Sequence, residues 1–231
     1  MNIDILFSHP DFYIIDKPAG IGVHKDATGE GIMGVLARQL PSEPLWLVHR
    51  LDKHTSGCLI LARNSQAAAE FGQLFTQRQI SKYYLAITAR KPAKKQGTVS
   101  GDMKKSRDGK WILTPQQHNP AISQFFSQGL FDGKRLILIK PHTGKTHQIR
   151  VMLKSLGAPI LGDSHYGGAH GDRTYLHAYC LKFSYQQQNI DVCCLPTQGE
   201  HFIRMLQGQH LSPFDQPALL TWPSLKMTKG S

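Results

Sequence analysis

Residues 45–63 read LWLVHRLDKHTSGCLILAR, in which two apolar runs, 45–48 and 58–62, flank a charged centre. Each run has the length and composition of a buried strand. The centre holds Arg50 and Asp52, and residues two apart in an extended segment point to the same face. Two interpretations remain open: a structural ion pair that anchors a turn, which the spacing alone favours, and a catalytic carboxylate beside a cation.

The flanking sequence predicts a mixed α+β domain. Short strands are expected over 4–24, interrupted at Pro10 and at a turn at 18–20. A short helix is expected over 28–40, and a longer one over 65–79 with Ser65 as its cap. Segment 82–90 is a predicted strand, and 97–139 is predicted to form antiparallel strands.

A third helix is predicted after the Thr-Gly turn at 143–144. Four apolar residues repeat at i, i+3, i+4 and i+7 and are expected to face the core: Ile149, Met152, Leu153 and Leu156. The opposite face carries His147, Arg150 and Lys154, which we expect to form one stripe of positive potential.

The charge balance points to a polyanionic partner. The chain has 231 residues, with 27 Lys and Arg against 16 Asp and Glu, an excess that is typical of nucleic-acid-binding proteins. Nine of the basic residues fall within 82–110, against Asp102 and Asp108. This segment is interpreted either as a solvated loop pair or as an RNA-binding surface. No apolar run is long enough to span a membrane, and no secretory signal is visible.

The four cysteines are expected to be reduced thiols of a cytoplasmic protein. They form no CxxC pairs, and the adjacent Cys193 and Cys194 suit neither an ordinary disulfide nor tetrahedral metal ligation.

Neither a nucleotide site nor a metal site is predicted. GEGIMG at 29–34 matches the glycine spacing of dinucleotide-binding folds, but the preceding residues are polar, so a glycine-rich helix start is the better interpretation. His49 and His147 lie beside basic residues, which repel a cation, and no HExxH motif is present.

Six blocks of the sequence resemble one enzyme family. HRLDKHTSG (49–57) closely resembles the signature of the RluA branch of the pseudouridine synthases, which isomerise uridine in RNA. Five further blocks follow the family's order: IIDKPAGIGVH (14–24), SKYYLAI (81–87), IKPHTGKTHQIRV (139–151), PILGDSHYG (159–167) and LHAYCLKF (176–183). The resemblance covers about 5–183. Met152 stands where relatives often have histidine, and the sequence beyond 184 follows the pattern poorly.

The resemblance implies a fold and a reaction. The fold is a mixed, mainly antiparallel sheet with peripheral helices and a central active-site cleft. Asp52 falls on the catalytic aspartate, Tyr84 on the active-site tyrosine and Arg150 on the basic partner of the aspartate. Arg50 falls on the residue thought to push into the RNA and displace the target base, and no cofactor is implied.

The RNA-binding surface is expected to comprise seven basic or histidine residues: His49, Arg50, Lys82, Lys104, Lys105, Lys145 and His147. We expect one catalytic domain over 1–231, without a separate N-terminal RNA-binding domain, that acts as a monomer on ribosomal or transfer RNA. One rival function is RNA binding without catalysis. Another is an RNA hydrolase or glycosidase, which would need two carboxylates or a metal. Asp163 is a poor second carboxylate and is interpreted as a turn residue.

Overall fold

The computed structural model describes residues 1–25, 29–223 and 225. The strands within these ranges are β1 Ile5–Ser8, β2 Phe12–Lys17, β3 Trp46–Leu47, β4 Ser56–Ala62, β5 Ser81–Thr88, β6 Gln96–Lys105, β7 Trp111–Thr114, β8 Ala121–Gly129, β9 Arg135–Pro141, β10 Leu176–Tyr185 and β11 Gln188–Cys193. The helices are α1 Ile32–Gln39, α2 Ser65–Thr76, α3 Gln148–Ser155 and α4 Glu200–Gln207, with short 3-10 helices η1 Phe131–Gly133 and η2 Ser164–Tyr166.

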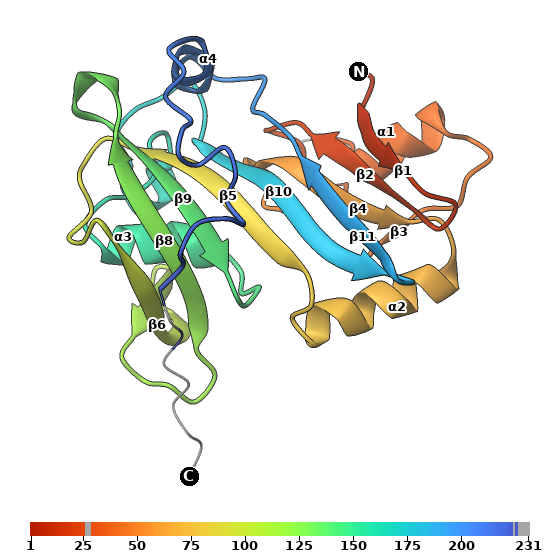
Figure 1. The fold of residues 1–231 in the computed structure, drawn as a ribbon, viewed down its shortest axis with the longest axis horizontal. Helices are drawn as coiled ribbons and strands as arrows, with labels where there is room; N and C mark the ends of the chain where they lie inside the picture. Colours follow the sequence, from red (N-terminus) through yellow and green to blue (C-terminus); the bar gives the residue numbers. More distant parts are fainter. Residues whose placement is uncertain (26–28, 224, 226–231) are drawn as a thin grey trace.

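These strands form one continuous sheet across the described part of the chain (Figure 1). Its order is β1-β2-β4-β10-β5-β9-β8-β6-β7, with β11 paired to β10 and β3 to β4. All strand pairs are antiparallel except β4 and β10, which are parallel. Gly57 sits at this parallel pairing, where a Cβ would lie 2.2 Å from the carbonyl oxygen of Ala178. The expected mixed, mainly antiparallel sheet with peripheral helices is confirmed.

The half of the sheet around β2 and β4 is covered by a helix on each face. Alternate residues of a strand point to opposite faces. Phe12, Ile14 and Ile60 join the core cluster that α2 covers, whereas Tyr13, Ile15 and Leu59 join the cluster that α1 covers. Because β2 and β4 are buried on both faces, each contains a continuous apolar run, 12–15 in β2 and 58–62 in β4.

The other half of the sheet is packed by α3 and by the end of the chain. Ile149, Met152 and Leu153 of α3 are buried against β5 and β9, as the apolar spacing predicted. Phe214 and Trp222, beyond α4, pack on the same cluster. In Figure 1, α3 lies behind β8 and β9, and the segment after α4 passes in front of them.

Two local predictions are wrong. The cap of α2 is Asn64, whose side-chain oxygen accepts the backbone N–H of Ala67 at 2.7 Å, and Ser65 is the first helical residue. The apolar run 45–48 forms only the two-residue, half-buried strand β3, which pairs with the far end of β4. That pairing leaves residues 48–55 free to form a loop.

The prediction that all cysteines are reduced is also wrong for two of them. The antiparallel register of β10 and β11 places Cys180 directly opposite Cys193, with their Cα atoms 4.1 Å apart, and a disulfide joins them. Cys58 and Cys194 remain free and buried. Adjacency of Cys193 and Cys194 does not prevent a disulfide, because only one of the two needs to bond to a neighbouring strand.

A buried histidine beside the parallel strand pair predicts a pH dependence of stability. His177 is 1% exposed, its Nε2–H donates to the carbonyl oxygen of Cys194 at 2.7 Å, and its Nδ1 lies 2.8 Å from Oγ of Ser56. Burial lowers the pKa of His177 to about 4. Below pH 6.5 the unfolded chain therefore binds a proton that the folded chain does not, and stability falls as the pH falls.

We expect His177 to remove about 2 kcal/mol from the free energy of unfolding between pH 7 and pH 5. Urea unfolding of the wild type at both pH values should show this loss, and His177→Gln should lack that share of it. The exposed His118 offers a control, because His118→Gln should retain the wild-type pH dependence. Equal pH dependence in His177→Gln and the wild type would contradict the assignment.

Candidate active site

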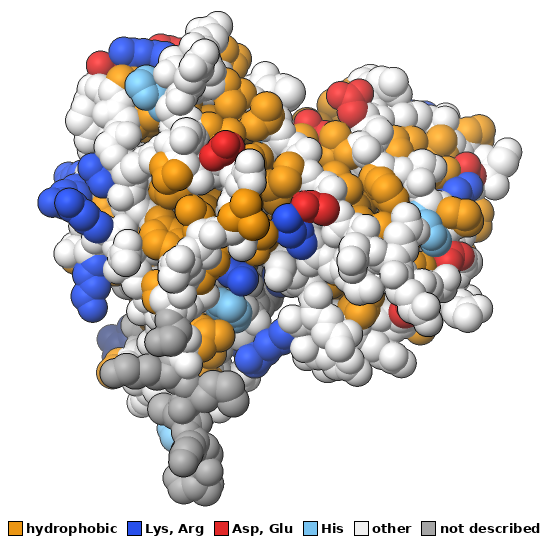
Figure 2. Space-filling model, in the orientation of Figure 1, with side chains coloured by type: hydrophobic (Ala, Val, Ile, Leu, Met, Phe, Trp, Pro, Cys, Tyr) orange, Lys and Arg blue, Asp and Glu red, His pale blue; other side chains and the backbone are white. Residues whose placement is uncertain are grey.

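A cleft of about 500 Å³ opens where the loop between β3 and β4 faces α3. Residues of 48–55, 75–84 and 140–150, together with Asn119 and Leu176, line it. Figure 2 shows an indentation at the lower edge of the molecule, between the halves that carry α2 and β8–β9, with Lys and Arg side chains beside it. Six lining residues are cationic: Arg50, Arg78, Lys82, Lys140, Lys145 and Arg150. Among the described lining residues, Asp52 is the single carboxylate.

Asp52 is held in a loop that the core anchors at several points. Leu51 is buried between the sheet and α1, and the backbone N–H of Thr55 donates to the carbonyl oxygen of Asp52 at 3.0 Å. The backbone carbonyl oxygen of the next residue, Lys53, accepts two hydrogen bonds. One comes from the backbone N–H of Gly20, at 2.9 Å, and the other from the side-chain ammonium of Lys17, at 3.3 Å. The loop that carries Asp52 is thus tied to the turn that follows β2.

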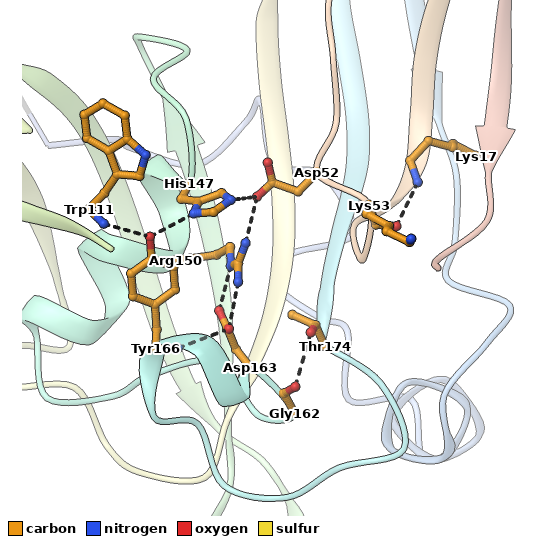
Figure 3. Close-up of polar contacts among 10 residues, drawn as sticks. All are labelled: Lys17, Asp52, Lys53, Trp111, His147, Arg150, Gly162, Asp163, Tyr166 and Thr174. Atoms are coloured by element: carbon orange, nitrogen blue, oxygen red, sulfur yellow. Dashed lines mark hydrogen bonds and ion pairs between the residues drawn. The ribbon is translucent and has the colours of Figure 1, made fainter. Parts of the chain in front are cut away.

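Lys17 is 0% exposed and ties these two loops together (Figure 3). Its Nζ also donates to the carbonyl oxygens of Pro18, at 2.9 Å, and Ile21, at 2.8 Å. Burial lowers the pKa of Lys17 to about 7. A lysine normally stays at the surface, so its burial next to the loop of Asp52 indicates a positioning function.

Replacing Lys17 with methionine is expected to lower the free energy of unfolding by about 2 kcal/mol, because buried carbonyl groups lose their donor. Turnover should fall as well, since the loop around Asp52 is released. Urea unfolding and single-turnover assays measure the two effects. Lys91→Met, at an exposed position, is the matched control and should change neither. Wild-type stability in Lys17→Met would refute the positioning function.

Arg150 lies between two carboxylates (Figure 3). Its Nη1 is 3.4 Å from Oδ2 of Asp52, and its Nε and Nη2 donate to the carboxylate of Asp163 at 2.7 and 2.9 Å. Arg150 is 7% exposed and Asp163 is 2% exposed. Arg150 is therefore buried, although the sequence places it on the face of α3 opposite the apolar residues. Burial disfavours its charge, but the hydrogen bonds to Asp163 and the charge of Asp52 outweigh this and raise the pKa of Arg150.

Asp163 is a turn residue, as expected, and it also fixes Arg150. Its side chain caps η2 by accepting the backbone N–H of Tyr166. A bidentate contact to a carboxylate holds a guanidinium in one plane. Asp163 therefore aims the free Nη1 of Arg150 at Asp52.

His147 forms the second contact to Asp52. Its Nε2 lies 4.0 Å from Oδ2 of Asp52, and its Nδ1 lies 2.8 Å from the hydroxyl of Tyr166. That hydroxyl also accepts the backbone N–H of Trp111 in β7 at 3.3 Å. Figure 3 shows the resulting chain of contacts from β7 through Tyr166 and His147 to Asp52. The β6–β7 hairpin is thus connected to the carboxylate.

Tyr84 of β5 lines the same cleft and is half-buried. Burial, followed by the negative charge of Asp52, raises the pKa of its hydroxyl, so the phenol stays protonated. The hydroxyl has no hydrogen-bond partner within the described residues. The structure therefore brings Asp52, Tyr84 and Arg150 together around one cavity.

The predicted RNA-binding residues divide into three groups. Arg50, Lys82, Lys145 and His147 line the cleft. Lys104 and Lys105 do not line it and lie at the end of β6, on the hairpin with Trp111. His49 lines the cleft, but its Nε2 accepts the backbone N–H of Ile60 at 2.9 Å, and burial lowers its pKa to about 3. The ring of His49 is neutral and braces β4, so it offers no positive charge to a phosphate.

Three cleft residues were not predicted. Arg78 adopts a positive φ of 58° in the turn that ends α2, Lys140 lies at the end of β9, and His142 follows that strand. Nothing in the spacing around Arg78 marks it. Lys140 and His142 fall within the quoted block 139–151, where a lysine and a histidine beside a turn gave no separate signal.

Within 1–25, 29–223 and 225, no group of three or more His, Cys, Asp or Glu side chains is arranged to hold a metal ion. Over the same residues, no helix has the length and apolar content that crossing a membrane requires.

A family model and two curated proteins that match this chain are all described as pseudouridine synthases. Residues 11–155 match the family model of RNA pseudouridylate synthase. A protein of Haemophilus influenzae named uncharacterized RNA pseudouridine synthase is 52% identical over 206 residues, which cover 88% of this chain and 92% of that one. The tRNA pseudouridine synthase C of Haemophilus ducreyi is 30% identical over 243 residues, which cover 93% of this chain and 99% of that one.

A solved structure shares the fold. The structure of human RNA pseudouridylate synthase domain containing 4 superposes with a TM-score of 0.72 at 29% identity, over 88% of this chain and 92% of that one.

Proposed function

The chain belongs to the RNA pseudouridylate synthase family and is an RNA-modifying isomerase, and we propose that Asp52 is the carboxylate on which its reaction depends. The supporting observation is the position of Asp52, the single carboxylate among the described residues of a cleft that six Lys and Arg residues line. A polyanion enters such a cleft readily, and Asp52 is the one group there that can act as an anion on the bound uridine.

The reaction moves the uracil from a nitrogen–carbon to a carbon–carbon bond with its ribose. The glycosidic bond breaks, the base turns within the cleft, and the ring carbon rejoins the sugar. That carbon loses its hydrogen as a proton, and the released ring nitrogen takes up a proton, so the product is an isomer of the substrate. No electrons are gained or lost. In each route that a carboxylate can take — attack on the sugar, attack on the base, or removal of the sugar's 2′ proton — Asp52 has to be ionised. Arg150, which Asp163 fixes in position, places a positive charge 3.4 Å from the carboxylate of Asp52.

The uridine has to leave its stack before it reaches Asp52, at a cost of a few kcal/mol. We propose that Arg50, which is exposed at the edge of the cleft, occupies the place that the base vacates. Lys82 and Lys145 bind backbone phosphates within the cleft, and Lys104 and Lys105 extend the contact along the β6–β7 hairpin. Tyr84 presents its ring to the uracil, and its protonated hydroxyl is available to donate a hydrogen bond.

The substrate is a structured RNA, and we propose transfer or ribosomal RNA, acted on in the cytoplasm by a monomer. The test is to map pseudouridines at base resolution in total RNA from cells that contain or lack this protein, and then to add the purified protein to the deficient RNA. The proposal predicts one or a few sites that are lost and restored, within a transfer or ribosomal RNA. An unchanged map, with no site restored, would contradict it, and release of free uracil would favour a glycosidase.

A further inference from the structure

Pro223, which lies beyond α4, determines the hydrogen bonding of a histidine in the cleft. Nε2 of His142 lies 2.7 Å from Oε1 of Gln124, a residue of β8 that is 2% exposed. The amide nitrogen of Gln124 donates to the carbonyl oxygen of Pro223, beyond α4. A carbonyl oxygen only accepts, so this contact fixes which end of the amide is nitrogen and turns Oε1 towards His142.

The imidazole of His142 therefore has one defined tautomer. Oε1 of Gln124 accepts a hydrogen, so Nε2 of His142 carries it and Nδ1 keeps its lone pair. Burial, together with the positive charges of Lys140, Arg78 and Lys82, lowers the pKa of His142 to about 4, so the ring is neutral. Nδ1 has no hydrogen-bond partner within the described residues, although the ring lines the cleft.

Trp222, next to Pro223, packs against the strands that precede His142 in the cleft. The ring of Trp222 packs 4.8 Å from that of Phe126 in β8 and 5.9 Å from that of Tyr83 in β5. Nζ of Lys140, two residues before His142, lies 5.6 Å from the ring centroids of both Tyr83 and Trp222. Trp222 thus packs against the end of β9, where Lys140 supplies a cation and His142, which follows the strand, supplies an acceptor.

We propose that Nδ1 of His142 accepts a hydrogen bond from an O–H or N–H of a nucleotide next to the target uridine, which makes His142 a specificity-determining residue. The inference rests on the proposed function, since it takes RNA as the occupant of the cleft. Phosphates pair with the surrounding Lys and Arg side chains. Nδ1 of His142 is a neutral hydrogen-bond acceptor, so it favours a hydrogen-bond donor of the RNA instead. RNA offers such donors in the ribose 2′-hydroxyl and in the base N–H groups.

Two substitutions separate this function from a structural one. The amide oxygen of His142→Asn can occupy the place of Nδ1, so it keeps the acceptor and loses the contact to Gln124. His142→Gln reaches the place of Nε2, so it keeps the contact to Gln124 and loses the acceptor. We expect KM for RNA to rise about five- to tenfold in His142→Gln, with kcat unchanged, and to stay within about twofold in His142→Asn. A structural function predicts the reverse order.

The source of the donor is found with modified substrates. If the donor is the ribose 2′-hydroxyl, a 2′-deoxy nucleotide next to the target should raise the wild-type KM about five- to tenfold and should not raise the KM of His142→Gln further. If the donor is a base N–H, a base analogue that lacks this N–H should have both effects. Equal KM in the wild type and both variants overturns the inference while the wild type still makes pseudouridine. If the wild type makes none, the proposed function fails instead, and filter binding of the same RNAs still compares the variants.

Discussion

An Asp52→Asn variant is expected to bind RNA as the wild type does and to form pseudouridine more than about a thousandfold more slowly. Asparagine has the shape of aspartate but is neither an anion nor a nucleophile. The Lys and Arg side chains that line the cleft are unchanged, so affinity for RNA should not fall. Turnover is measured by release of tritium from RNA labelled at carbon 5 of uridine, and affinity by filter binding.

Asp191→Asn is the matched control. Asp191 lies on β11, outside the cleft, where it pairs with Lys182 on the neighbouring strand. Its replacement should leave turnover unchanged. Turnover of Asp52→Asn within about tenfold of the wild type would show that another group performs the chemistry.

An Arg150→Ala variant is expected to lose both activity and stability. The change removes the cation beside Asp52 and leaves the buried carboxylate of Asp163 without its partner. Removal of one member of a buried ion pair costs about 3–5 kcal/mol. Urea unfolding should show this loss, and turnover should fall sharply at protein concentrations where the variant is still folded.

A second variant separates the two effects. In Arg150→Met combined with Asp163→Asn, both charges are gone and the amide oxygen at 163 still accepts the N–H of Tyr166. We expect this double variant to recover most of the lost stability and to remain inactive. Wild-type turnover in the double variant would show that Arg150 is not needed for the reaction. Wild-type stability in Arg150→Ala would show that the buried ion pair of Arg150 and Asp163 does not stabilise the fold.

The sequence predicted the elements that local patterns control. Strands β2, β4 and β5 and helices α2 and α3 follow from apolar periodicity, because each buries its pattern against the sheet. Arg50 and Asp52, which interrupt the apolar pattern of 45–63, both line the cleft, although their spacing alone favoured a structural ion pair. The family resemblance is what distinguished the catalytic interpretation from a structural ion pair.

Features that depend on distant partners were not predicted. The helical repeat placed Arg150 opposite the apolar face of α3 but gave no sign of its burial, because nothing in α3 reveals that Asp163 pairs with it. Cys180 and Cys193 meet because of the register in which β10 and β11 pair, and the sequence of either strand alone does not reveal this register. Lys17 is buried because carbonyl groups from two loops converge on it, and the DKPAG segment alone indicated only a turn.

The most direct test of the account is a structure of the Asp52→Asn protein bound to its substrate RNA. We predict that the target uridine is flipped into the cleft, with its ring against Tyr84 and its sugar beside the side chain at position 52. A target uridine that stays stacked in the RNA, or that binds away from positions 52, 84 and 150, would contradict the account.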